Sequence, residues 1–250
     1  MVKIKDIASL AGTSVSTVSR VLNGIVIRDN ELADRIREIA QEVNYQPNVA
    51  GRNLRMGFDK DFGPAFDVRS QQDLQSKREI AASAAKLIGP ADSVALDSGS
   101  TVAQVANYLP ENMLVYTNSL AVLQSAARRG AHVNLAPGLY VPTMAAVFGE
   151  DTEEYFRQHR FTKYFLSSAR VDVRTGLFNL NPMTYRIKQI VMEQSDTKVL
   201  MVHHDKFCDT GLASYAPLTA VNVLVTDFVP DPFRDAMSES GLQVIETAKA

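Results

Sequence analysis

Two short amphipathic helices separated by a tight turn are predicted within residues 3–24, and this pairing constrains the fold more than any other feature. Gly12 supplies the turn between two crossing helices. Ser14 can cap the second helix by accepting from a free backbone N–H of its first turn. Apolar side chains recur at helical spacing on one face of each helix: Ile4, Ile7, Ala8, Leu10, Ala11, Val18, Val21 and Leu22. The outward face of the second helix is small, polar or basic, as the major groove of DNA requires.

A third amphipathic helix and a short basic segment complete this region. Asp29 is a suitable N-cap for the helix, and apolar side chains recur at helical spacing from Leu32 to Val43. The motif YQPN at 45–48 follows, and a basic stretch runs to Arg55. Three helices with a basic segment predict a DNA-binding head. A three-helix bundle that binds only protein is the alternative interpretation.

The order and spacing of these segments resemble the lac repressor (LacI) family over about residues 2–56. The matching motifs are IKDIA, LAG, SVSTVSRVLNG, YQPN and the RNLR that ends the hinge. The resemblance implies base contacts, phosphate contacts and an apolar wedge, Leu54, which kinks the minor groove of a palindromic operator. The residues to which it gives DNA contacts are Ser14, Val15, Ser16, Thr17, Ser19, Arg20, Asn23, Asn48, Arg52 and Leu54.

Composition limits the function classes that remain. The chain has 250 residues, 46% of them hydrophobic, which suits one or two packed domains. It contains no apolar run of about 18 residues, so we expect neither a membrane span nor a signal peptide. The single Cys208 excludes an internal disulfide framework and suits a cytoplasmic location. Residues 1–57 carry eight Lys/Arg and six Asp/Glu, whereas the whole chain has a net charge of −2, so the DNA-binding end is the basic one.

The composition changes twice along the chain, which predicts a head at 1–56, a linker at 57–72 and a body at 73–250. The linker is rich in Gly, Pro and Asp. Its phenylalanines at 58, 62 and 66 have helical spacing, but Gly63-Pro64 interrupts them, so we expect an irregular strap that lies on the body.

The body alternates predicted strands and helices, which favours a mostly parallel sheet with helices on both faces. The predicted strands cover 94–97, 113–116, 132–136, 163–167, 198–203, 222–226 and 243–246, and the predicted helices cover about 73–88, 101–108, 119–128, 150–159, 183–194 and 232–240. In such sheets, ligands bind beyond the carboxyl ends of the strands.

Two of these strand ends carry polar turns, DSGST at 97–101 and TNS at 117–119. Each turn opens a helix and offers hydroxyl and backbone N–H groups that suit an anion such as phosphate. Either turn could instead serve only as a helix cap. Lys188 and Lys206 are possible counter-charges.

The body resembles the sensor domain of DeoR-type regulators, which shares a Rossmann-like fold with sugar-phosphate isomerases and CoA transferases. The resemblance covers about residues 73–248 and rests on KREIA, LDSGST, YTNS, KYFL, HDKF, APL and VTD in that order. It implies a phosphorylated-sugar effector held by Asp97, Ser98, Gly99, Ser100, Thr101, Thr117, Asn118, Ser119, Gly138, Lys188 and Lys206.

This body departs from the family pattern at three places. Ala136-Pro137-Gly138 replaces a Gly-Gly turn, Met183 and Thr184 replace an acidic position, and His203 replaces a usual Asp. The lost carboxylates change which sugar hydroxyls can be held.

The sequence therefore predicts a hybrid regulator with an all-α helix-turn-helix head and an α/β Rossmann-like sensor domain. We expect a dimer or tetramer on a palindromic operator, no cofactor and no catalytic residues. One alternative is an isomerase-like enzyme that uses Asp97, Asp227 or His203 as its base. Another is a DNA-binding protein without small-molecule control.

A metal site at His203, His204, Asp205 and Cys208 is not expected. The reason is that successive strand residues point to opposite sides.

Overall fold

The computed structural model describes residues 4–22, 30–42, 64–179, 181–209 and 214–247. Two compact units divide the chain, Met1–Arg55 and Met56–Ala250. Within the described ranges, no helix has both the length and the apolar character needed to cross a bilayer.

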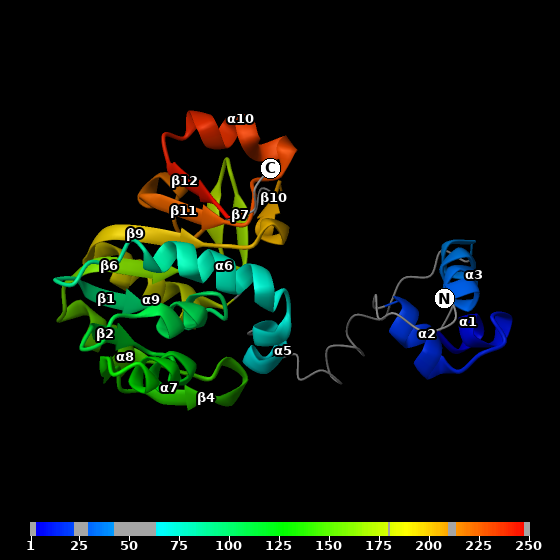
Figure 1. Cartoon of the computed structure of the whole chain (residues 1–250), viewed down its shortest axis with the longest axis horizontal. Helices are drawn as coiled ribbons and strands as arrows, with labels where there is room; N and C mark the ends of the chain where they lie inside the picture. The colour runs from blue at the N-terminus through cyan, green and yellow to red at the C-terminus, as the bar shows by residue number, and fades with distance from the viewer. Residues whose placement is uncertain (1–3, 23–29, 43–63, 180, 210–213, 248–250) are drawn as a thin grey trace. The chain divides into compact units, whose positions relative to one another are not determined.

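The N-terminal unit contains α1 (Ile4–Leu10), α2 (Val15–Leu22) and α3 (Asn30–Glu42) (Figure 1). Its small core gathers side chains from these helices and from the turn between α1 and α2: Ile7, Ala8, Ala11, Val18, Val21, Ala33 and Ile36. Gly12 has a φ of 64°, and the Ser14 hydroxyl accepts from Thr17 N at 3.1 Å, which confirms the predicted turn and cap. Leu10, expected on the buried face, is 55% exposed because α1 ends there and Ala11 takes the inward position.

A seven-stranded sheet forms the C-terminal unit in the order β12-β11-β9-β6-β1-β2-β3. Its strands are β1 (Ser93–Leu96), β2 (Leu114–Thr117), β3 (His132–Leu135), β6 (Phe161–Leu166), β9 (Ser195–Met201), β11 (Val223–Thr226) and β12 (Gln243–Glu246). Every neighbouring pair is parallel, as predicted. Short apolar strands buried on both faces pack in this way.

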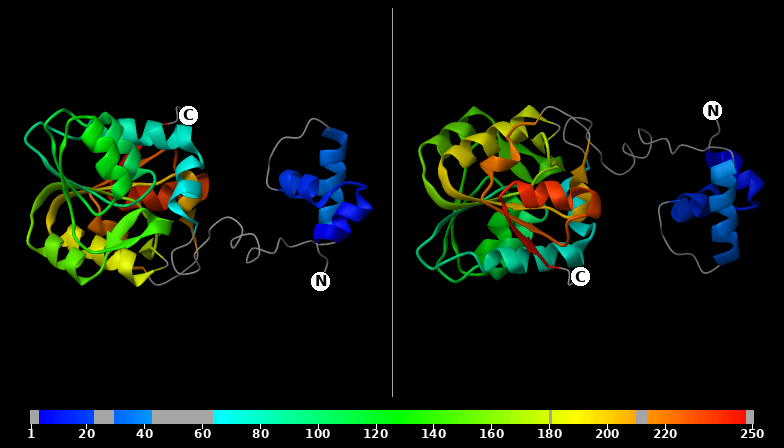
Figure 2. Two further views of the ribbon diagram at one scale, coloured as in Figure 1. Left: turned by 90° about the horizontal axis from the view of Figure 1, so that it is seen from below. Right: turned by 90° about the horizontal axis from the view of Figure 1, so that it is seen from above.

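Helices cover both faces of this sheet (Figure 2). One apolar core lies beneath α6 (Leu74–Ala85), the 3₁₀ helix η1 (Val102–Tyr108) and α7 (Leu120–Arg128). The other core receives side chains from α8 (Glu150–Arg157), α9 (Pro182–Glu193) and α10 (Asp231–Glu239). The sheet is therefore doubly covered, and its strand ends remain the accessible place for a ligand.

Several short elements were not predicted from the sequence because they span only two or three residues. β4 (Leu139–Val141) and β5 (Ala146–Phe148) form an antiparallel pair joined by η2 (Pro142–Met144). A second small sheet contains β10 (Phe207–Cys208), β7 (Arg170–Asp172) and β8 (Gly176–Phe178). The remaining 3₁₀ helices are η3 (His204–Lys206) and η4 (Leu218–Ala220).

A short helix, α5 (Phe66–Gln71), corrects the prediction of an irregular strap for the whole of 57–72. Gly63-Pro64 precedes this helix rather than interrupting it, so the turn residues are compatible with its start. Phe66 is buried in the core beneath α6, while Phe58 and Phe62 lie outside the described residues. The described part of this segment, α5, therefore packs on the body.

Candidate functional site

A cavity of about 540 Å³ opens at the carboxyl ends of β1, β6 and β9. Its wall combines the turn after β1, the loop after β6, the end of β9, and parts of α5 and α9. Its polar and charged lining includes Arg69, Lys77, Ser98, Ser100, Thr101, Ser167, Ser168, Arg170, Asn179, Asn181, Lys188, His203 and Lys206. The cavity thus lies where an α/β sheet of this topology binds ligands.

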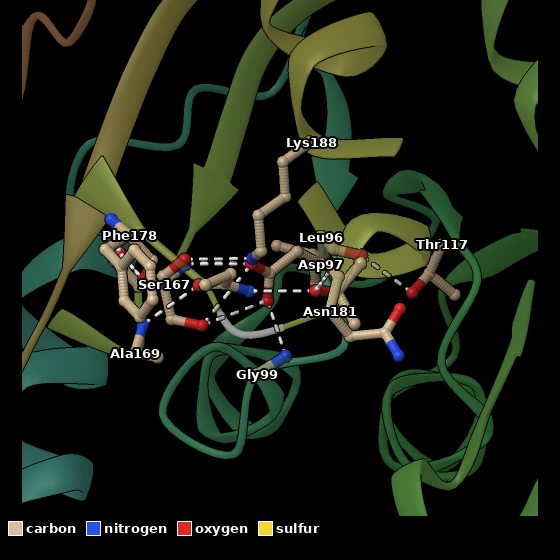
Figure 3. Close-up of polar contacts among 12 residues, drawn as sticks. Leu96, Asp97, Gly99, Thr117, Ser167, Ala169, Phe178, Asn181 and Lys188 are labelled. Carbon is tan, nitrogen blue, oxygen red and sulfur yellow. Dashed lines mark hydrogen bonds and ion pairs between the residues drawn. The ribbon is translucent and has the colours of Figure 1, made fainter. Parts of the chain in front are cut away.

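Asp97 holds three parts of this wall together (Figure 3). Its carboxylate accepts from Gly99 N at 2.5 Å and from Ser167 N at 2.8 Å, and it forms an ion pair with Lys188. The Lys188 ammonium also donates to Ser167 O at 2.9 Å. Both charged residues are 5% exposed. Asp97 therefore neutralises Lys188 and fixes the turn after β1 against the loop after β6 and against α9.

The turn after β1 presents its polar side chains to the cavity, and effector contact by them stays a prediction. The lining includes Ser98, Gly99, Ser100 and Thr101 but not Asp97. A Cβ atom on Gly99 would overlap the Ser167 side chain, so only glycine permits the two loops to approach this closely.

Arg69 is a half-buried cation at the cavity, and the sequence did not predict it there. Its Nε donates to Pro64 O at 2.9 Å, and its guanidinium lies 5.5 Å from the centre of the Phe66 ring. Burial lowers the pKa of Arg69, and the negative charge of Asp97 opposes that shift. Among the described residues, no carboxylate forms a salt bridge with Arg69. A desolvated cation in this position favours an anionic ligand.

Lys77 is a second cationic group that the sequence analysis did not assign to the site. It is 6% exposed, and its ammonium donates to Gln72 O at 2.7 Å and to Arg69 O. Burial lowers the pKa of Lys77 to about 8, with a smaller contribution from the charge of Lys206. Lys206 itself lines the cavity and donates to Asp205 at 2.8 Å. Arg69 lay in the predicted linker. Lys77 is the first residue of the KREIA match, but that match gave it no role in the site.

The second polar turn lies next to the first but does not line the cavity. Thr117 Oγ1 donates to Leu96 O at 2.7 Å, and Asn118 Nδ2 donates to Val147 O at 2.9 Å. Ser119 caps α7 by accepting from Val122 N at 3.3 Å. Gly138 has a φ of 145° and lies too close to Phe148 O for a Cβ atom. These contacts hold the framework, and effector contact by these four residues stays a prediction.

His203 and His204 form a cluster with Asp227 beside the cavity. Their rings lie 4.1 Å apart, and both contact the Asp227 carboxylate, so the prediction that they face opposite sides is wrong. The reason is that β9 ends at Met201 and the chain bends into η3, where strand alternation no longer applies. Burial alone would raise the pKa of Asp227, but hydrogen bonds from His204 and the charges of both histidines lower it overall.

The predicted DNA-contacting residues fall mainly on α2. Val15 is 41% exposed, and Ser14 and Thr17 exchange a side-chain hydrogen bond of 2.9 Å. Ser16, Ser19 and Arg20 also belong to α2. The remaining four, Asn23, Asn48, Arg52 and Leu54, lie outside the described residues.

Two known families match this chain in consecutive segments. Residues 72–228 match the DeoR C terminal sensor domain, and residues 3–48 match the bacterial regulatory proteins of the lacI family. The first match covers more than half of the chain. This protein therefore belongs to the DeoR sensor-domain family and carries a LacI-type N-terminal segment.

Individual relatives are also regulators by name. The transcriptional repressor AccR of Agrobacterium fabrum is 30% identical over 155 residues, and the match covers 60% of each chain. The HTH-type regulator FruR of Bacillus subtilis is 22% identical over 98% of this chain and 92% of its own. The L-fucose operon activator of Haemophilus influenzae is 25% identical over 67% of this chain and 68% of its own.

Among solved structures, ribose 5-phosphate isomerase A of Methanocaldococcus jannaschii aligns with a TM-score of 0.42 and 17% identity. That alignment covers 56% of this chain and 57% of the isomerase.

Removing either charge of the Asp97–Lys188 ion pair should destabilise the body. We expect Asp97→Asn to lower the free energy of unfolding by about 3–5 kcal/mol, because it leaves the Lys188 ammonium buried without a counter-charge. Lys188→Met should lower it less, since Asp97 keeps its two backbone donors. The double variant should recover part of the loss in urea unfolding. Strictly additive losses would show that the two side chains are not energetically coupled.

Proposed function

We propose that this protein is a DNA-binding transcriptional regulator, a repressor of a carbohydrate-utilisation operon, and that a phosphorylated sugar controls it. The observation that carries the proposal is the cavity at the strand ends, in a DeoR-type sensor domain that follows a LacI-type DNA-binding segment. The named role of the L-fucose operon activator supports a sugar-linked operon.

The chemistry of the cavity supports an anionic, hydroxylated ligand. Arg69 and Lys77 provide positive charge in a largely desolvated wall. Hydroxyl and amide groups surround them, contributed by Ser98, Ser100, Asn179 and others of the lining set. A volume of about 540 Å³ is ample for a sugar phosphate and falls within the range of small-molecule sites.

The residues that line the cavity fit a ligand-binding regulator better than an isomerase-like enzyme. Proton abstraction from a sugar needs a base that reaches the substrate. Among the described residues that line the cavity there is no carboxylate, and Asp97 is paired with Lys188 outside the lining. His203 does line the cavity, but its two ring nitrogens already contact the carboxylates of Asp205 and Asp227. We therefore propose that the cavity binds its ligand without transforming it.

Control of DNA binding requires the ligand to favour one of two arrangements of the protein, typically by 1–3 kcal/mol. We propose that the protein binds a palindromic operator as a dimer or a tetramer, because each chain has one head and the LacI-type wedge needs a symmetry mate. Arg69 belongs to α5, the first described element after the head. A ligand that binds Arg69 therefore acts on the segment of chain leading from the head.

The first test concerns DNA. Arg20→Ala should lose about 1–3 kcal/mol of discrimination between the operator and random DNA, provided that Arg20 makes a bidentate contact to guanine. Fluorescence anisotropy with a palindrome from the adjacent promoter measures both affinities. Arg35→Ala, on the exposed surface of α3, is the control. An equal loss on both DNAs would make Arg20 a phosphate contact.

The second test concerns the effector. At least one pentose or hexose phosphate should raise the melting temperature of the full chain and change its operator affinity. Ser100→Ala combined with Lys206→Ala should keep operator binding but lose the response, because both residues line the cavity. Ser238→Ala combined with Lys86→Ala, at two exposed positions, is the matched control. A wild-type response in the cavity variant would place the effector elsewhere.

Effector affinity should also fall as the pH rises from 7 to 9. The pKa of Lys77 is lowered to about 8, so its ammonium loses its proton in this range, and the fall should approach roughly 10-fold. A phosphate monoester is already fully charged above its pKa of about 6 and contributes no such change. Lys77→Arg, which stays charged, should bind with nearly constant affinity by calorimetry. A wild-type affinity that is independent of pH would remove Lys77 from the anion site.

A further inference from the structure

Three potential metal-binding atoms converge at the carboxyl ends of the adjacent strands β9 and β11. His203 Nε2 lies 3.1 Å from Asp227 Oδ2, and His204 Nδ1 lies 2.5 Å from the same oxygen. One ligand atom from each of the three residues falls within a group no wider than 4.8 Å. Bonds of about 2 Å to one ion would place such atoms roughly 3–4 Å apart, so small side-chain movements complete the site.

The surrounding contacts orient each of these groups toward the centre of the cluster. Asp227 Oδ1 accepts from His204 N at 2.7 Å and from Thr226 Oγ1 at 3.2 Å, which leaves Oδ2 directed at the two imidazoles. His203 Nδ1 lies 2.9 Å from Asp205 Oδ1. A carboxylate on the far nitrogen of a histidine is the usual support of a metal-bound imidazole. Asp205 therefore holds His203 in the orientation that a metal site needs.

Burial and charge are also compatible with a cation. His203 and Asp227 are buried and His204 is half-buried, so the cluster is part of the folded wall rather than a solvated surface group. Asp205 and Asp227 supply two negative charges, and Lys206 pairs with the outer oxygen of Asp205. Two imidazole nitrogens and one carboxylate oxygen are a ligand set that Zn²⁺ and Fe²⁺ accept, whereas Mg²⁺ and Ca²⁺ prefer oxygen alone.

We propose that His203, His204 and Asp227 bind one divalent first-row transition-metal ion, with Zn²⁺ as the representative case. The ion would join the end of β9 to the end of β11 beside the cavity, to which His203 also belongs. Three protein ligands leave one position of a four-coordinate ion for a further ligand. The binding of the ion does not depend on the identity of the effector, and its test uses the metal alone.

The test measures Zn²⁺ binding to the full chain after removal of metal by chelator. We expect about one ion per chain by calorimetry and mass spectrometry, together with a rise in melting temperature. Co²⁺ in place of Zn²⁺ should give the visible absorption of a four-coordinate site. His204→Gln and Asp227→Asn should each weaken Zn²⁺ binding by at least about 10-fold. Asp205→Asn should weaken it by about 10–100-fold through the orientation of His203.

Matched controls keep this test decisive if one variant folds poorly. His132→Ala removes an exposed histidine from β3 and should leave Zn²⁺ binding unchanged. His204 is only half-buried, so His204→Gln should keep the fold. Absence of stoichiometric Zn²⁺ binding by the wild type would overturn the proposal. Equal binding by wild type, His204→Gln and Asp227→Asn would also overturn it.

Discussion

The buried ion pair between Asp97 and Lys188 is the contact on which the rest of the site depends. It lies where β1, β6 and α9 meet, and its two charges are removed from water. A buried pair of this kind contributes little to stability compared with apolar packing, but each charge is costly without the other. The pair therefore holds the turn after β1 in one place, so that Ser98, Ser100 and Thr101 face the cavity.

The same pair changes which residues are available to a ligand. Lys188 has the expected position, but its charge is already balanced within the wall. The positive charge left for an anion comes instead from Arg69 and Lys77, which α5 and α6 bring to the cavity, and from Arg170 and Lys206 in the same lining. Lys77 also donates to Arg69 O and Gln72 O, so it joins the end of α5 to the body. Arg69 and Lys77 therefore connect the charge of a ligand in the cavity to the position of α5.

The departure from the usual family residue at His203 has a structural counterpart. In place of a carboxylate at the strand end, this chain has His203, whose ring lies with that of His204 against the carboxylate of Asp227. Imidazole nitrogens bring a different binding chemistry to the cavity wall. The position of the lost family carboxylate is therefore occupied by part of a polar cluster and not by an apolar side chain.

Local patterns in the sequence predicted much of this protein. Glycine at position 12 and serine at position 14 define a turn and a cap, and both depend only on nearby residues. The alternation of short apolar strands with amphipathic helices predicted the doubly covered parallel sheet, because periodicity follows from local geometry. The sequence also predicted that the polar turn after β1 lies where a ligand would bind, because the carboxyl ends of parallel strands meet at one edge of the sheet.

Only the tertiary structure decided which polar and charged groups share a site. The order of the sheet places β1 beside β6 and β9, so the turn at 98–101 lines the cavity whereas the one at 117–119 supports the framework. Arg69 joins the site from a segment without a readable period. His203 and His204 converge because the chain bends after Met201. The first two outcomes depend on packing between residues that are far apart in the chain, and the third depends on a local break in periodicity. The spacing of neighbouring residues encodes neither long-range packing nor such a break.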